Sequence, residues 1–185
     1  MSLQYCVKLN LPVKVDTNFQ DYKINNKFHS VIPNEVFGNE FNSFLSNMNL
    51  EIDWLEVFYL SENTKHQVHC DSAFLDKDFG KINYVIGGAN SEMIWYDTFN
   101  ENTGEIKKTK ANTTYRLIEF ENVKPVFSKN ISGFYLVNVG VFHTVKNESE
   151  ERYCLSAYIR DKRTNTRLTF TKLKQKFKEF TNENV

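Results

Sequence analysis

The stretch Phe134-Tyr135-Leu136-Val137-Asn138-Val139-Gly140-Val141-Phe142 decides the fold class. It is rich in aromatic and β-branched residues, which is typical of a buried β-strand. Shorter stretches of the same kind occur at residues 54–60, 81–86, 93–99, 113–120 and 152–159. Strands at such spacing predict a mainly β protein, folded as a barrel or a sandwich.

The residues before these strands predict a different kind of structure. Residues 4–15 alternate apolar and polar side chains, which predicts an early strand with a kink at Pro12. In residues 34–48 the apolar side chains recur every three or four positions, which predicts a helix with Pro33 near its start.

The chain ends on a second helical pattern. Phe170, Leu173 and Phe177 have helical spacing and predict an amphipathic helix over residues 168–181; its lysines leave a basic surface for a partner open as an alternative. No linker or repeat divides the sequence. We therefore expect one domain, residues 1–185, with an N-terminal strand and helix in 1–50, a β core in 54–160 and the C-terminal helix.

Composition excludes several classes of protein. Hydrophobic residues make up 41% of the 185 residues, which suffices for a core. Lys+Arg and Asp+Glu both total 23, so no global positive field favours nucleic acid. No apolar run approaches the roughly 18 residues that span a bilayer. The three cysteines lack CxxC spacing, which fits a reducing compartment. We expect a soluble cytoplasmic protein that binds no membrane; the sequence leaves its oligomeric state open.

Three side chains form a candidate metal site. In an extended segment residues i and i+2 share a face, so His69 and Asp71 can present an imidazole and a carboxylate to one point. His143, at the end of the predicted strand 134–142, is the candidate third ligand. Two histidines and one carboxylate bind Fe(II) on one face and leave the other positions open.

Arg152 follows His143 by nine residues and opens the next predicted strand. A polar, turn-like segment joins the two strands, which predicts an antiparallel pair that brings Arg152 back beside the histidine. A guanidinium in this place can hold a dicarboxylate through a bidentate, charge-assisted pair.

The order of these residues resembles the Fe(II)- and 2-oxoglutarate-dependent oxygenases, and in particular the small oxygenase-like proteins of marine bacteria and their phages. The resemblance covers residues 54–160. It rests on these sequence segments: Phe58-Tyr59, His66-Gln67-Val68-His69-Cys70-Asp71, Ile82-Asn83-Tyr84-Val85, Met93-Ile94-Trp95-Tyr96, Leu136 through Asn147, and Arg152-Tyr153-Cys154-Leu155-Ser156. It implies a double-stranded β-helix, which is a jelly-roll or cupin-like barrel.

The resemblance also implies cofactors and residue roles. Fe(II) would be held by His69, Asp71 and His143, and the distal carboxylate of 2-oxoglutarate by Arg152, with O2 as the second cosubstrate. Relatives often carry a serine two residues after the arginine, where this chain has Cys154. Ser156, further along the same face, is therefore a weaker candidate for cosubstrate binding. The interval from His143 to Arg152 is at the short end of the family's range, so Arg160 is kept as a weaker substitute for Arg152.

The implied reaction is hydroxylation of a substrate with conversion of 2-oxoglutarate to succinate and CO2. A small molecule or an amino-acid or peptide side chain ranks before a nucleobase as substrate. Lys107, Lys108 and Lys110, in a predicted hairpin loop or flap at residues 100–112, are the basic cluster that could change this ranking. The candidate residues of a substrate pocket are Tyr59, Asn83, Trp95 and Tyr96, although aromatic residues in so aromatic a chain are more often core. A phage-encoded protein would act in the host cytoplasm.

Other functions fit part of this pattern. A cupin-like protein without catalysis could use the same barrel to bind a metal or ligand or to interact with another protein. A lectin-like or capsid-type jelly roll would leave the histidines, Asp71 and Arg152 unexplained, and a zinc hydrolase would not need Arg152. In the simplest case, the histidines are polar residues at strand ends and Asp71 caps a turn.

Overall fold

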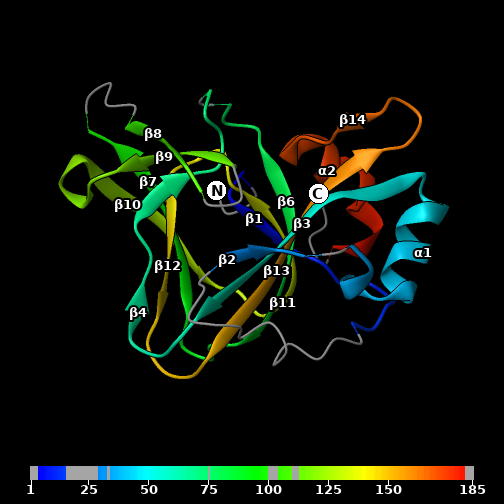
Figure 1. Ribbon diagram of the computed structural model, residues 1–185, viewed down its shortest axis with the longest axis horizontal. Coiled ribbons are helices and arrows are strands. Elements are labelled where there is room, and N and C mark those ends of the chain that lie inside the picture. Colours follow the sequence, from blue (N-terminus) through cyan, green and yellow to red (C-terminus); the bar gives the residue numbers. More distant parts are fainter. Residues whose placement is uncertain are drawn as a thin grey trace.

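The computed structural model describes residues 4–15, 29–32, 34–74, 76–99, 104–109 and 113–181, and it shows a mainly β protein with two short α-helices (Figure 1). The strands form two sheets in which all pairs are antiparallel. In spatial order, the first sheet contains β1 (Cys6–Lys8), β11 (Gly133–Asn138), β6 (Gly80–Gly87), β13 (Arg152–Asp161), β3 (Leu50–Leu60) and β2 (His29–Val31), with β14 (Thr166–Arg167) paired to β13.

The second sheet contains, in order, β10 (Val123–Asn130), β7 (Glu92–Thr98), β12 (His143–Asn147), β5 (Val68–Cys70), β9 (Thr114–Ile118) and β8 (Glu105–Lys108), with β4 (Thr64–Lys65) paired to β12. No strand is shared between the sheets in the part of the chain that the structure describes. The molecule is therefore a two-sheet sandwich of the jelly-roll kind, and the closed barrel implied by the resemblance does not form.

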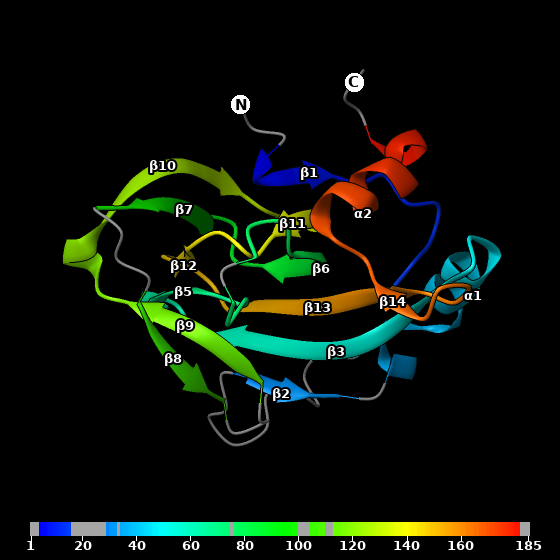
Figure 2. The ribbon, with the colours of Figure 1, turned by 90° about the horizontal axis from the view of Figure 1, so that it is seen from above.

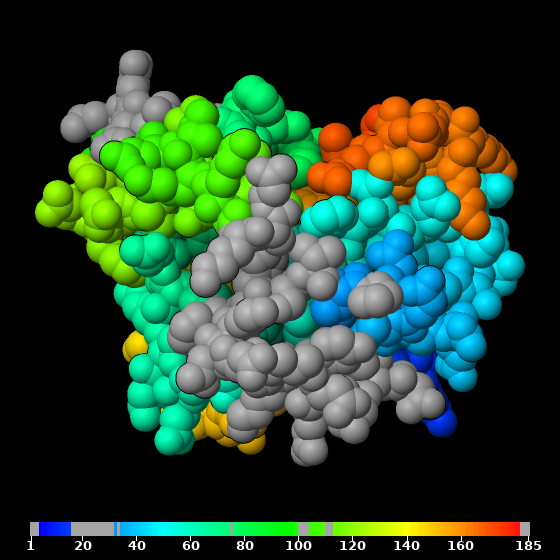
Figure 3. All heavy atoms as spheres, viewed as in Figure 1, coloured from blue at the N-terminus to red at the C-terminus, as the bar shows by residue number. Residues whose placement is uncertain are grey.

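The first sheet lies between the second sheet and the helices (Figure 2). Its central strand β13 is buried on both faces. Leu155, Ala157 and Ile159 pack against Leu45 of α1 (Asn39–Asn47) and Leu173 of α2 (Phe170–Lys176) in one core. The alternate side chains of β13 face the second sheet, because successive residues of a strand point to opposite faces. In the space-filling view, α2 and β14 lie on the opposite side of the molecule from β8, β9 and β10 (Figure 3).

The helical regions follow the predicted apolar spacing with one interruption. Residues 34–48 form a 3-10 helix at Asn34–Phe37 and then α1, and Gly38 between them has a φ of 92°, which favours glycine. The C-terminal helix is α2, followed by a short 3-10 helix at Lys178–Phe180. Pro33 lies outside the described residues. No helix in the described ranges is long and apolar enough to cross a membrane.

The predicted strand 134–142 is wrong in its second half. β11 ends at Asn138, and the next residues cross to the other sheet, where His143 begins β12. The reason is a set of hydrogen bonds to a loop: Phe79 accepts from the amides of Val139 and Gly140, and Val139 accepts from the amide of Asp71. Gly140 permits this crossing, since a Cβ there would lie 2.1 Å from the carbonyl oxygen of Asp76.

The predicted pairing of the strands around Arg152 is also wrong. β12 and β13 belong to different sheets, so Arg152 faces the strand of His143 across the sandwich and is not its hydrogen-bonded neighbour.

The boundaries of other strands differ less from the prediction: β3 begins at Leu50, four residues before the predicted strand, and β1 covers only the start of the pattern at 4–15. Within residues 100–112, the described part contains β8, which pairs with β9, while Lys110 lies outside the described residues.

Candidate metal centre

Three side chains of the second sheet meet at its face toward the first sheet. His69 lies in β5, Asp71 follows that strand, and His143 is the first residue of β12. His69 and His143 are direct partners across the two strands, and their ring centroids are 4.5 Å apart. One ligand atom from each of His69, Asp71 and His143 lies within 4.8 Å of the others. The structure therefore brings the three predicted ligands together, although by a different chain path from the predicted one.

Backbone carbonyls orient both imidazoles. Nδ1 of His69 lies 2.9 Å from the carbonyl oxygen of Gln67, and Nδ1 of His143 lies 2.8 Å from that of Val141. Because a carbonyl oxygen only accepts, each Nδ1 carries the proton and donates it. Each Nε2 then has a free lone pair, which is the state that a metal-binding histidine needs.

The charges of the site suit a divalent cation. Burial, the largest influence, and the neighbouring His69 lower the pKa of His143 to about 3, against the opposing effect of Asp71. Burial alone would raise the pKa of Asp71, but Lys81 and the two histidines hold it well below its usual range. At neutral pH the site consequently contains a neutral imidazole at His143 and an ionised carboxylate, which are the forms that coordinate metals.

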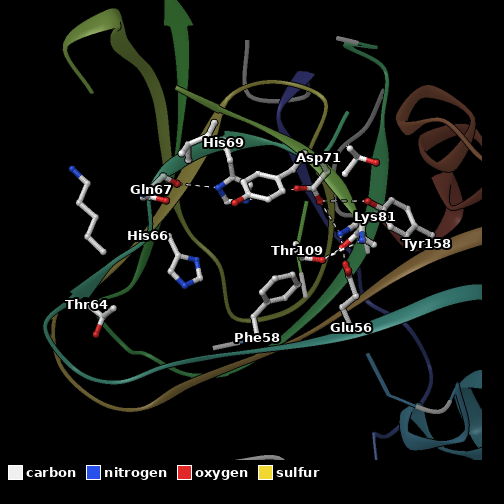
Figure 4. A pocket seen from close by; sticks show the side chains of 15 residues that line it. Glu56, Phe58, Thr64, His66, Gln67, His69, Asp71, Lys81, Thr109 and Tyr158 are labelled. Atoms are coloured by element: carbon white, nitrogen blue, oxygen red, sulfur yellow. Dashed lines mark hydrogen bonds and ion pairs between the residues drawn. The ribbon is translucent and has the colours of Figure 1, made fainter. Parts of the chain in front are cut away.

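A buried lysine from the first sheet contacts this carboxylate. Nζ of Lys81, in β6, lies 2.7 Å from Oδ2 of Asp71 and 2.6 Å from Oε2 of Glu56, in β3. The two carboxylates raise the pKa of Lys81 well above its usual value, although burial opposes this. Figure 4 shows Asp71 between His69 on one side and Lys81 on the other. Lys81 and Glu56 are not among the residues predicted from the sequence; the available signal was a charged residue at an inward position of each strand.

Arg152 lines a small cavity beside the candidate ligands. The cavity has a volume of about 50 Å³ and is lined by Phe58, His66, His69, Asp71, Lys81, Asn83, Met93, Val139, His143, Val145, Arg152, Cys154 and Ser156. Arg152 is 2% exposed, and its Nε has no hydrogen-bond partner. Among the described residues, no carboxylate forms an ion pair with it. A buried guanidinium without a counter-charge is costly, so the cavity is suited to an anion.

The neighbours of Arg152 make room for it and add polar groups. A Cβ at Gly88 would lie within 3.0 Å of the Arg152 side chain, so the end of β6 leaves space for its stem. Ser156 donates a 2.7 Å hydrogen bond from its hydroxyl to Oδ1 of Asn83, and both residues line the cavity. Arg160, the weaker predicted candidate, does not line it: its guanidinium pairs with Asp53.

Three of the four residues predicted for a substrate pocket lie elsewhere. The indole of Trp95 is fully buried and donates to the carbonyl oxygen of Asn138. Tyr96 is also buried and packs on Phe120, and the hydroxyl of Tyr59 donates to Glu151. None of the three lines a hollow at the metal centre. Strand alternation turns the side chains of Trp95, Tyr96 and Tyr59 toward other parts of the protein. Of the four predicted residues, only Asn83 lines the small cavity beside Arg152.

Two larger hollows open beside the candidate ligands. One has a volume of about 530 Å³ and is lined by residues that include His69, Asp71, Lys81 and Tyr115 (Figure 4). The other, of about 590 Å³, shares Asp71 and Tyr158 with the first and extends to Trp54, Phe74 and Arg167. Thr109 lines the first hollow, whereas the neighbouring Lys107 and Lys108 are exposed on β8 and line neither.

The comparisons with known proteins found likeness only among solved structures. No family model and no curated protein matches the chain. The similar structures include an oxidoreductase of the 2OG-Fe(II) oxygenase family from Burkholderia pseudomallei, at 10% identity and a TM-score of 0.38 over 68% of this chain and 53% of that one. They also include HygX from Streptomyces hygroscopicus with nickel and 2-oxoglutarate bound, at 10% identity and a TM-score of 0.42 over 76% and 72% of the two chains.

A third similar structure is E. coli ycfD, at 9% identity and a TM-score of 0.36 over 62% of this chain and 27% of that one. This chain thus spans about half of the first of the three proteins and about a quarter of the third. Likeness at these TM-scores assigns neither a family nor an activity. The functional argument therefore rests on the residues of the site.

Proposed function

We propose that the chain is an Fe(II)- and 2-oxoglutarate-dependent dioxygenase. The observation that carries the proposal is a three-ligand cluster beside a buried arginine to which the described part of the chain supplies no counter-charge. Two imidazoles and one carboxylate, with ligand atoms within 4.8 Å of one another, fit the facial set that holds Fe(II) and leaves the remaining positions open. An exclusively structural zinc site would need a fourth protein ligand, and none of the described His, Cys, Asp or Glu side chains joins the cluster.

Arg152 is the proposed partner of the distal carboxylate of 2-oxoglutarate. The site contains two buried cations, but Lys81 already contacts two carboxylates, whereas Arg152 contacts no carboxylate of the described residues. An incoming carboxylate therefore gains more at Arg152, where it also forms charge-assisted hydrogen bonds to a planar fork. Asn83 and Ser156 add polar atoms to the wall of the same cavity.

The cofactor supplies the redox chemistry. When bound by His69, Asp71 and His143, the iron would couple the conversion of 2-oxoglutarate to succinate and CO2 with hydroxylation of the substrate, and one oxygen atom of O2 would enter succinate and the other the product. The protein would bind and orient the reactants at a site walled in part by Phe58, Tyr115 and Tyr158.

The substrate belongs, in this proposal, in the two hollows that meet at Asp71 and Tyr158. Their volumes, about 530 and 590 Å³, fall in the range of small-molecule sites. Nε1 of Trp54 is buried without a hydrogen-bond partner and lines the second hollow, so it can donate to an acceptor of the substrate. These features support a small molecule or an amino-acid or peptide side chain over nucleic acid. The lysines of β8 line neither hollow, and of the basic residues that do, Lys81 and Arg167 are paired with carboxylates, which leaves Lys65.

An anaerobic titration followed by turnover tests the proposal. We expect one Mn(II) or Fe(II) per chain, binding of 2-oxoglutarate to the metal-loaded protein, and slow formation of succinate with O2 even without the substrate. Unchanged metal binding in Asp71→Ala and His143→Ala would refute the assignment of the ligands. Binding of metal and 2-oxoglutarate without any succinate would leave the non-catalytic binding protein as the better description.

A further inference from the structure

Lys81 is the least expected residue of the site. It is 2% exposed, and it reaches from the first sheet to a carboxylate of the second. Burying an ammonium group costs several kcal/mol of desolvation, which good geometry and additional hydrogen bonds must offset. A hydrophobic residue would fill this place at a lower cost. The lysine is therefore a candidate for a role beyond stability.

We propose that Lys81 is a positioning residue that decides which buried carboxylate the metal receives. It holds Asp71 with one oxygen toward the imidazoles, and it keeps Glu56 out of the ligand set. This inference rests on the proposed metal centre and adds a residue to it.

The two oxygens of Asp71 face different partners. Oδ1 lies 3.7 Å from Nε2 of His69, on the side of the ligand cluster, and Oδ2 lies 2.7 Å from Nζ of Lys81. A free carboxylate rotates about its Cβ–Cγ bond, since this torsion is broad. The contact with Lys81, supported by a longer one of 3.5 Å from the Tyr158 hydroxyl to the same Oδ2, fixes the rotation, so that Oδ1 stays directed at the metal position.

Glu56 is the second carboxylate that a metal could attract. It is 3% exposed and lines the same hollow as His69 and Asp71, yet it is not a member of the three-residue ligand cluster. Its Oε2 instead contacts Nζ of Lys81 at 2.6 Å. Without the lysine, this carboxylate would lose the ammonium group that balances its charge beside a cation site, and coordination would relieve that charge. A fourth protein ligand would close one of the open metal positions that the cosubstrate needs.

The surroundings of Lys81 prevent it from moving away. Its Nζ lies 4.2 Å from the ring centroid of Tyr158 and 5.7 Å from that of Phe58, so aromatic faces stabilise the ammonium group. Glu56 lies opposite Ser156 in the β3–β13 pair, and Ser156 lies opposite Asn83, two residues from Lys81 in β6. The lysine and Glu56 are thus held by three hydrogen-bonded strands of the first sheet.

The decisive variant keeps the net charge and removes the positioning. The wild-type trio of Asp71, Glu56 and Lys81 carries two negative charges and one positive charge. The double variant Lys81→Met/Glu56→Gln retains only Asp71, so its net charge is the same. We expect its Mn(II) affinity, measured by anaerobic calorimetry, to fall about tenfold or more, because loss of an outer contact to a metal ligand typically costs 10–100-fold. An affinity equal to that of the wild type would overturn the proposal.

A matched control comes from the surface of the same protein. Lys107 and Glu105 form an exposed ion pair on β8. The variant Lys107→Met/Glu105→Gln makes the same two chemical changes away from the site, so Mn(II) should bind to it as to the wild type. An equal loss in both double variants would show a general effect of these substitutions and would also overturn the proposal.

Two single variants separate positioning from charge. Glu56→Gln keeps the contact between Lys81 and Asp71, so its Mn(II) affinity should stay within about threefold of the wild type. A loss of affinity as large as that of the double variant would mean that the negative charge of Glu56, and not positioning by Lys81, governs the affinity. Lys81→Met frees Glu56 to coordinate, so the visible spectrum of the Co(II)-loaded protein should change and 2-oxoglutarate should bind more weakly. An unchanged spectrum together with unchanged 2-oxoglutarate binding would contradict the second part of the proposal.

Folding and the proposed function are checked in the same series. Thermal melts without metal show which variants are folded; if the double variant does not fold, the Co(II) spectrum and the 2-oxoglutarate binding of Lys81→Met carry the test. A wild-type protein that binds no Mn(II) would end the proposed function itself. Normal binding by the wild type and the double variant alike would end only the role of Lys81.

Discussion

Replacing Arg152 by methionine should stabilise the protein and remove cosubstrate binding at the same time. The guanidinium is 2% exposed, its Nε has no partner, and no described carboxylate pairs with it. Methionine fills the space of the stem without the charge. Exchanging buried ionic groups for apolar side chains has stabilised proteins by about 1–4 kcal/mol, and we expect about 2 kcal/mol here. For a chain of this length, that gain corresponds to a rise of about 4–8 °C in Tm.

The second measurement concerns the ligand. With Mn(II) present, 2-oxoglutarate at a hundredfold excess over its Kd should add about 2.7 kcal/mol to the stability of the wild type. This gain should vanish in Arg152→Met. Arg152→Lys keeps the charge but loses the planar fork, so it should bind about tenfold more weakly, a difference of about 1.4 kcal/mol. Thermal and urea unfolding with and without 2-oxoglutarate give both quantities.

Arg160 provides the control for this experiment. Arg160→Met breaks the pair with Asp53 and should slightly destabilise the protein without changing the effect of 2-oxoglutarate. The reasoning is refuted if Arg152→Met lowers the Tm and retains the gain from 2-oxoglutarate. If Arg160→Met removes that gain instead, the cosubstrate carboxylate binds at the other arginine.

Three further predictions follow from the site and the fold. The folded-state pKa of His143 is about 3, below the usual value of 6.5 in the unfolded chain. Between these two pH values the unfolded state binds more protons than the folded state. The unfolding free energy of the metal-free protein should therefore fall by about 2 kcal/mol from pH 6.5 to pH 4.5. Urea unfolding measures this slope, and His143→Phe should flatten it. Asp71→Asn keeps the shape of the side chain but loses the charge, so calorimetry should detect no tight Mn(II) binding; wild-type affinity would exclude Asp71 as a ligand. Gly140→Ala places a Cβ 2.1 Å from the carbonyl oxygen of Asp76 and should cost about 1–3 kcal/mol in unfolding free energy, whereas a neutral effect would mean that the crossing between the sheets relaxes freely.

Strands β6, β7 and β13 could be predicted from the sequence because each carries several periods of its pattern, whereas no prediction covers β10, whose eight residues are mostly exposed and include Pro125. β6 and β7 form within one residue of the predicted bounds 81–86 and 93–99, and β13 begins at the predicted residue 152. β5 and β12 contain three and five residues, and too few side chains alternate there to give a signal. The chain path between β11 and β12 depends on hydrogen bonds to Phe79, which is distant in sequence.

The candidate ligands could be predicted because their chemistry is local. His69 and Asp71 are two residues apart, and imidazole with carboxylate is informative at that spacing. The role of Lys81 is a property of three strands: the ammonium group is tolerated only because Glu56 of β3 and Asp71 of the other sheet meet it. No pattern within β6 itself specifies these partners. The role of a buried charged residue therefore cannot be predicted from one sequence when its partners come from other strands.

The two sheets supply different residues of the site, so the site depends on the whole sandwich. The second sheet supplies the three candidate ligands, and the first sheet supplies Lys81, Glu56 and Arg152. Residues of both sheets, such as Met93 of β7 and Cys154 of β13, share one apolar core that sets the distance between them. A shift of the sheets would part Lys81 from Asp71 and move Arg152 relative to the ligands. A metal with a dicarboxylate bound across this gap would connect the sheets, so ligand binding and sheet packing must stabilise each other.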